Sequence, residues 1–208
     1  MTVLHLAPAG MPRIELPVRG RDLRGRWRTA IGVAWLLATG VSCASGSRPQ
    51  AGRLRLALSP ASFGTTVSLQ QHVHVEYAGR DADLDALLDI SPDSLTLVGL
   101  TLGRRVMTLR FDGTRLTEER HPLVPGEVQG ADILTDMQLA LWPVDAVRGG
   151  LPSPWSVEEL AGTRLFSVGG RRAIEITYEG TPRWSGTVTL RDLLSGYRLV
   201  VQSALLDP

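Results

Sequence analysis

The feature that most constrains the fold of this chain is an apolar residue at every second position, repeated along several segments. Residues 67–77 show it most clearly, with apolar side chains at one parity and polar side chains at the other: Val67, Leu69, Val73, Val75 and Tyr77 against Ser68, Gln70, His72, His74 and Glu76. Successive side chains of a strand point to opposite faces. The segment therefore predicts a strand with one buried and one solvated face.

Further segments share this period and are separated by turn residues. They are residues 82–90, 94–99, 107–111, 115–119, 164–168, 174–178, 184–190 and 197–201. Residues 82–90 also suit a helix, because Leu84, Leu87 and Leu88 recur at helical spacing. Many strands joined by short turns, such as Asp112-Gly113, predict an antiparallel meander that is curved or barrel-like.

The period changes once, at residues 131–142. Ile133, Leu134, Met137, Ala140 and Leu141 form an apolar stripe at helical spacing. Leu139 and Trp142 lie outside the stripe, so we expect a helix covered on two faces, ended or kinked by Pro143. The predicted fold class is mainly β with α (α+β). It is a curved antiparallel half-barrel-like sheet, covered on its concave face by a helix around residues 131–142.

The N-terminal region carries an export signal. An uncharged run over Thr29–Ser42 follows several arginines and ends at Cys43, the only cysteine. The run is short for a membrane span, which needs roughly 20 apolar residues. We interpret it as a lipoprotein signal in which Cys43 becomes the first mature residue and carries acyl groups such as palmitate.

This interpretation divides the chain into three parts. Residues 1–42 are the signal peptide with an over-long N-terminus, 43–52 a lipidated flexible tether, and 53–208 a single β domain. The residue after the cysteine, Ala44, favours the outer membrane, with the domain facing the periplasm. Two alternatives remain: an ordinary secretory signal cut near Ala44 or Ser45, or an uncleaved anchor.

Charge excludes one class of partner. Loss of residues 1–42 removes six arginines and two acidic residues, which leaves 16 basic against 19 acidic residues. A mildly acidic domain gives no electrostatic basis for binding nucleic acid.

The residues that could carry catalysis or hold a metal have simpler structural explanations. His72 and His74 share a strand face with Glu76, but alternation alone produces such pairs, so we favour a solvated polar face and predict no metal. Glu118 and Glu119 fall at an expected strand end, where charge is common. The sequence contains no G-x-S-x-G, P-loop or G-x-G-x-x-G motif. We therefore predict a protein that is not an enzyme, with no catalytic residues and no cofactor.

Four segments resemble an uncharacterised family of bacterial outer-membrane lipoproteins, known only as a domain of unknown function. They are ILTDMQLALWP from Ile133, LRFDGTR from Leu109, YEGTPRW from Tyr178 and GYRL from Gly196. The resemblance implies a fold similar to the lipoprotein carriers LolA and LolB. It also implies an association with aryl-polyene-type biosynthetic clusters, and hence an acylated, polyene-bearing lipid. It transfers no catalytic residues.

The predicted function is binding or delivery of a hydrophobic or acylated ligand, held between sheet and helix. The expected partners are the membrane, to which the lipid anchor attaches the protein, the lipid or polyene ligand, and a periplasmic carrier protein. The candidate pocket residues are Leu109, Phe111, Met137, Leu141, Trp142, Tyr178 and Trp184.

Two other functions stay open. A structural or assembly lipoprotein that binds protein partners would show an exposed apolar patch on the helix, at Leu139 and Trp142, or an open sheet edge. An enzyme acting on a lipid head group would need polar residues converging where sheet and helix meet.

Overall fold

The computed structural model describes residues 53–206. The predicted signal peptide, Cys43 and the predicted tether lie outside the described residues, so these assignments stay predictions. Among residues 53–206, no helix is both long and apolar enough to cross a membrane.

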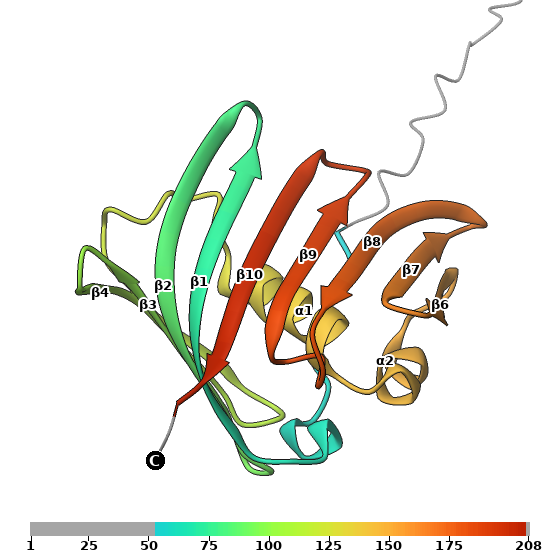
Figure 1. Ribbon diagram of the computed structural model, residues 1–208, viewed down its shortest axis with the longest axis horizontal. Helices are drawn as coiled ribbons and strands as arrows, with labels where there is room; N and C mark the ends of the chain where they lie inside the picture. The colour runs from blue at the N-terminus through green and yellow to red at the C-terminus, as the bar shows by residue number, and fades with distance from the viewer. Residues whose placement is uncertain (1–52, 207–208) are drawn as a thin grey trace, which may run out of the picture. The chain divides into compact units, whose positions relative to one another are not determined.

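The described part is built on one open antiparallel sheet of ten strands that curves around a helix (Figure 1). The strands lie side by side in the order β5-β4-β3-β2-β1-β10-β9-β8-β7-β6, so the first and last strands of the domain, β1 and β10, pair at its centre. Their bounds are β1 Val67–Tyr77, β2 Arg80–Ile90, β3 Leu95–Thr101, β4 Arg104–Phe111, β5 Leu116–Arg120, β6 Trp155–Leu160, β7 Thr163–Val168, β8 Arg171–Glu179, β9 Gly186–Asp192 and β10 Tyr197–Leu205.

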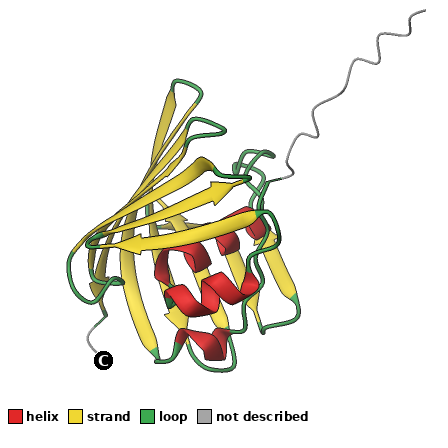
Figure 2. Ribbon diagram, turned by 90° about the vertical axis from the view of Figure 1, so that its right-hand side faces the viewer, coloured by secondary structure: helices red, strands yellow, loops and turns green. Residues whose placement is uncertain are grey.

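Helices fill the concave side of the sheet (Figure 2). The longest is α1 (Gly130–Leu141), followed by α2 (Val144–Gly150), and a short 3-10 helix η1 (Pro60–Phe63) precedes β1. Pro143 separates α1 from α2, as expected of a residue that cannot donate a helical hydrogen bond. The predicted fold class and the central helix are therefore confirmed.

Three elements were not predicted: η1, α2 and β6. The segment expected as a strand over 184–190 begins at Gly186, so Trp184 lies in the preceding turn. The segment 82–90, which also suited a helix, is a strand because it pairs with β1 along its whole length.

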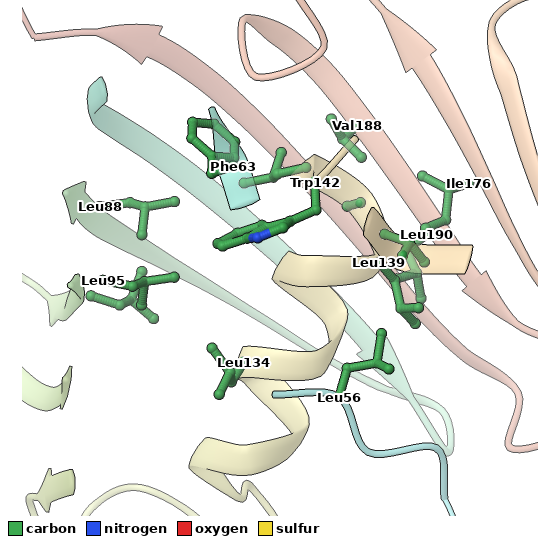
Figure 3. Close-up of a cluster of buried hydrophobic side chains, with 14 of the residues drawn as sticks. Leu56, Phe63, Leu88, Leu95, Leu134, Leu139, Trp142, Ile176, Val188 and Leu190 are labelled. Atoms are coloured by element: carbon green, nitrogen blue, oxygen red, sulfur yellow. The ribbon is translucent and has the colours of Figure 1, made fainter. Parts of the chain in front are cut away.

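The core lies between α1 and the concave face of the sheet (Figure 3). Leu139 and Trp142 are both fully buried, which confirms that α1 is covered on two faces. The ring of Trp142 lies 5.1 Å from that of Phe63. The helix therefore presents neither Leu139 nor Trp142 as an exposed apolar patch.

The β1–β2 hairpin extends past the helices. Residues of β1 that face the helix are buried at Val67 and Leu69 but only partly buried at Val73 and Val75. In Figure 2 the strand ends on this side of the sheet rise beyond the helices. Part of the concave face is therefore left without a helix over it.

Candidate functional site beside the central helix

Two hollows lie next to α1. The smaller, of about 40 Å³, lies between the helix and the strands β1, β9 and β10. The larger, of about 440 Å³, lies on the other side of Asp136 and is lined by the start of the domain, α1, β6, β8 and the β9–β10 turn. The smaller has room for a few water-sized groups only, whereas ligand sites span about 300–1,000 Å³. The larger hollow is therefore the candidate site.

Its lining is half apolar and half polar by residue. The apolar residues include Leu54, Leu139, Trp155, Ile174 and Leu194. The polar ones are Arg53, Thr135, Asp136, Asp192 and Ser195. This mixture is typical of sites that hold an apolar ligand and orient one polar end of it.

The segment 53–58 forms one wall of the cavity because α1 holds its backbone. The Leu56 amide donates to Thr135 Oγ1 at 3.1 Å. The Leu58 amide donates to Gln138 Oε1, and Gln138 Nε2 donates back to the Leu58 carbonyl, both at 2.9 Å. Gln138 is fully buried, and its amide group pairs with Leu58 much as a neighbouring strand would.

Two arginines of this segment face two aspartates of α1. Arg55 lies 2.8 Å from Asp132 Oδ1, and Arg53 lies 3.4 Å from the same atom and 3.5 Å from Asp136 Oδ2. Asp132 is thus an ion-pair partner in the first turn of α1, where an acidic side chain also suits the helix dipole.

Asp136 is the titratable group of the site. Burial raises the pKa of its carboxyl to about 7, an effect that the nearby Arg53 opposes and Asp132 reinforces. The carboxyl lines both hollows, and burial is the largest cause of the shift in its pKa. A carboxyl with a perturbed pKa at a cavity is a marker of functional sites.

The aromatic residue beside these charges is Tyr197. Burial raises the pKa of its hydroxyl above the usual range, and its ring lies 5.6 Å from the Arg53 guanidinium. Arg53 is therefore held by a ring and by two carboxylates at once, at the point where the described chain begins.

The polar groups of the cavity include a serine paired with a carboxylate. Ser195 Oγ donates to Asp192 Oδ2 at 2.8 Å, but the residues that line this cavity include no histidine. A serine and a carboxylate without an imidazole lack the usual base that activates the hydroxyl.

The structure distributes the seven predicted pocket residues over three places. Met137 and Leu141 line the smaller hollow, between sheet and helix as expected. Leu109, Phe111 and Trp142 are buried in the core and fill the space that a ligand there would need. None of the seven lines the larger cavity.

Tyr178 and Trp184 lie at the C-terminal end of α1. Tyr178 donates its hydroxyl hydrogen to the Ala140 carbonyl at 2.8 Å. The ring of Trp184 lies 5.4 Å from that of Phe63. Tyr178 therefore fixes the end of the helix against β8, and Trp184 packs against η1.

The cavity residues that were not predicted lie in segments whose apolar residues show little periodicity. Leu54 and Leu56 alternate with Arg53 and Arg55, and this alternation could have identified an extended segment with one buried face. Asp192 ends β9 and Leu194 lies in the turn that follows, and no local pattern points to their meeting α1.

Glu118, which the sequence placed at an expected strand end, contacts the start of α1. Its carboxylate accepts the Gly130 amide at 3.0 Å, at the first residue of α1, and pairs with Arg120 at 2.5 Å. An acidic group at a helix N-terminus stabilises the unpaired amides there.

Comparison with known proteins assigns the chain to a family. No curated protein matches. A crystal structure of a LolA superfamily protein from Nitrosomonas europaea is similar over 73% of this chain and 93% of that chain, with 10% sequence identity and a TM-score of 0.36. Residues 68–205 match the family described as "Protein of unknown function (DUF3261)".

The chain belongs to the DUF3261 family. The membership predicted from the motifs is confirmed. The description of the family assigns it no activity.

In this DUF3261 protein, two of the motifs meet at the C-terminal end of α1. Arg164, fully buried, donates to the carbonyls of Leu139 at 2.6 Å and Trp142 at 3.0 Å. Tyr178 and Arg183, from the YEGTPRW segment, donate to the carbonyls of Ala140 and Trp142. The last carbonyls of a helix have no partner within it, so these side chains replace a cap and orient the helix on the sheet.

Proposed function

We propose that this protein is an outer-membrane lipoprotein whose domain binds a hydrophobic or acylated ligand in the periplasm and helps to deliver it. The observation that carries the proposal is the cavity of about 440 Å³, which is lined by both apolar and polar residues. A site of this size and composition suits an acyl or polyene chain with one polar end. The family resemblance noted above favours an aryl-polyene-type lipid as the ligand.

The polar residues give the ligand an orientation. Its chain would lie against Leu139, Trp155 and Ile174, while its polar end meets Arg53 and Asp136. Arg53 carries the positive charge of this group and is less than half exposed. A ligand whose polar end is acidic or hydroxylated would find a donor there.

Anchoring is supported by the sequence alone. Arg53 lies ten residues after Cys43, and a fully extended chain spans at most about 3.6 Å per residue. A domain tethered through Cys43 would stay within roughly 36 Å of the membrane surface by the same limit. The cavity would thus remain near the lipids from which a ligand is taken or to which it is passed.

The test begins with native mass spectrometry of the full-length protein extracted from its own membranes. A chain that begins at Cys43 with added acyl mass, and a further non-covalent lipid or polyene mass, is the expected result. A chain cut elsewhere without acyl groups would refute the anchor. An acylated chain that never carries a second lipid would refute ligand binding.

A pair of variants tests the site itself. Leu194 lines the cavity and is 50% exposed, whereas its neighbour Leu193 is 49% exposed and does not line it. Leu194→Trp should weaken the binding of a fluorescent polyene fatty acid by roughly tenfold, because the larger ring occupies the mouth. Leu193→Trp is the matched control and should bind like the parent. Equal affinities in the two variants would place the ligand elsewhere.

The uncovered part of the sheet favours a second function, that of an assembly protein. Val75 and Leu84 are only partly buried on the concave side of the β1–β2 hairpin, and Tyr77 at its tip is 51% exposed. Against this, the edge strands β5 and β6 are short and each carries two glutamates, which hinders pairing with another strand. A photo-crosslinking residue at Tyr77 in intact cells would give a protein adduct if this surface binds a partner, and none if it does not.

A further inference from the structure

The outer face of the β1–β2 hairpin brings two histidines together with acidic residues of the next strand. The strand register places His72 opposite Asp85, His74 opposite Asp83 and Glu76 opposite Asp81. Residues directly opposite in an antiparallel pair share a face, with Cβ atoms about 5 Å apart. The sequence shows the two histidines as a pair on one strand, and only the register shows which carboxylates face them.

The side chains converge on Asp83. His74 Nδ1 lies 2.8 Å from Asp83 Oδ1, and His72 Nε2 lies 3.5 Å from the same oxygen. His74, Asp81 and Asp83 each offer a ligand atom within 4.8 Å of the others. Zinc binds nitrogen and oxygen ligands at about 2.1 Å, so small rotations of these exposed side chains would let all three reach one ion.

The charge around the histidines also favours a cation. Four carboxylates lie on this face of the hairpin, on Glu76, Asp81, Asp83 and Asp85, and the described cation paired with them is Arg198, which contacts Glu76. Among the described residues, Asp83 and Asp85 form ion pairs only with the two histidines. A divalent ion would balance this charge.

We propose that the outer face of the β1–β2 hairpin binds one divalent transition-metal ion of the zinc class, through His74, Asp83 and Asp81 with His72 beside them. Imidazole ligands suit zinc, copper and nickel, whereas calcium and magnesium prefer oxygen alone. The ion would join β1 to β2 and stiffen a hairpin that the helices do not support. The face lies opposite Val73 and Val75, so the site is separate from the cavity beside α1.

Calorimetric titration of the full-length protein in detergent, free of any purification tag, tests the proposal with ZnCl₂. We expect one Zn²⁺ per chain, and an affinity lowered by roughly tenfold or more in His74→Ala and in Asp83→Asn. His121→Ala is the matched control, because His121 follows the edge strand β5, and its affinity should equal that of the parent. CaCl₂ should give no comparable binding.

Histidine side-chain nitrogen shifts in NMR spectra provide a second readout. Zn²⁺ should move the signals of His72 and His74 and leave that of His121 in place. Binding that survives in the His72→Ala/His74→Ala double variant, or that is lost equally in His121→Ala, would overturn the proposal. Loss of ligand binding to the cavity in any of these variants is not expected, so the two proposals fail separately.

Discussion

At the scale of single residues, the polar side chains around α1 explain why this helix sits where it does. Arg164 is a fully buried cation whose neighbours are the carbonyls of Leu139 and Trp142 and the carboxylate of Glu159, 3.1 Å away. Burying a charge is costly unless it is paired and hydrogen-bonded. Here the carbonyls at the end of α1 accept hydrogen bonds from Arg164, and the carboxylate of Glu159 in β6 pairs with its charge.

Replacement of Arg164 should therefore destabilise the fold. Arg164→Met leaves the Leu139 carbonyl without its donor and the Trp142 carbonyl with Arg183 alone, and we expect the free energy of unfolding to fall by about 2–3 kcal/mol. Arg171→Met, at an exposed position of β8, is the control and should change it by less than about 0.5 kcal/mol. Urea unfolding measures both. A stable Arg164→Met would mean that packing, and not the cap, holds the end of the helix.

Asp136 should make stability depend on pH. Because burial raises the pKa of this carboxyl to about 7, the folded protein keeps the proton at a pH where the unfolded chain has released it. The contribution of the Asp136 carboxyl to the free energy of unfolding is fully present below about pH 4. It is lost as pH rises through about 7. At roughly 1.4 kcal/mol for each pH unit between these two values, the loss is at most about 4 kcal/mol.

Unfolding of the parent and of Asp136→Asn should be compared between pH 4 and pH 8. The stability of the parent relative to the variant should decline over this range, because the amide does not titrate. Asp145→Asn is the control, since the Asp145 side chain is 87% exposed, and it should follow the parent. Parallel curves for the parent and Asp136→Asn would contradict the raised pKa.

At the scale of elements, α1 is fixed at both ends and along one side. Glu118 accepts the amide of Gly130 at its start, three donors bind its last carbonyls, and Gln138 pairs with the backbone of Leu58. The sheet thus holds the helix from β5 to β8, and the helix in turn holds the first extended segment of the domain.

Gln138 gives a direct test of this last contact. In Gln138→Leu the Leu58 amide and carbonyl lose their partners, and we expect destabilisation by about 2–3 kcal/mol. Hydrogen exchange of the Leu58 amide should quicken more than that of the strand amides. Gln202→Leu, exposed on β10, serves as the control. Unchanged exchange at Leu58 would show that the segment is held by Leu54 and Leu56 instead.

The elements differ in how far their sequences reveal them. Strands β1 and β8 were predictable because one face of each is buried and the other solvated, which produces alternation. α2 was not, since its seven residues are mostly exposed and only Val147 is buried. β6 was missed because it is an edge strand, and Glu158 and Glu159 interrupt its pattern. The periodicity of apolar residues reflects which side chains are buried. Elements that bury few side chains therefore leave no periodic pattern in the sequence.

At the scale of the whole molecule, the architecture could be predicted but the location of the cavity could not. Alternation and one helical stripe were enough to predict a helix on the concave face of a curved sheet. The predicted pocket residues were chosen for being large and apolar, and Leu109, Phe111 and Trp142 form the core for the same reason. The cavity is instead made by Arg53, Asp192 and Leu194, which meet only after the chain has closed around α1.

The attachment of residues 56–58 to α1 also decides how the domain would bear a mechanical load. A pull on the N-terminal side of the chain passes through Arg53 to Leu56 and Leu58, whose backbone is bonded to Thr135 and Gln138. The force therefore reaches the buried helix before it reaches β1. From there Arg164 and Tyr178 spread it into β7 and β8. A domain held on a tether would thus be strained through its core, and its strands would not be peeled away one at a time.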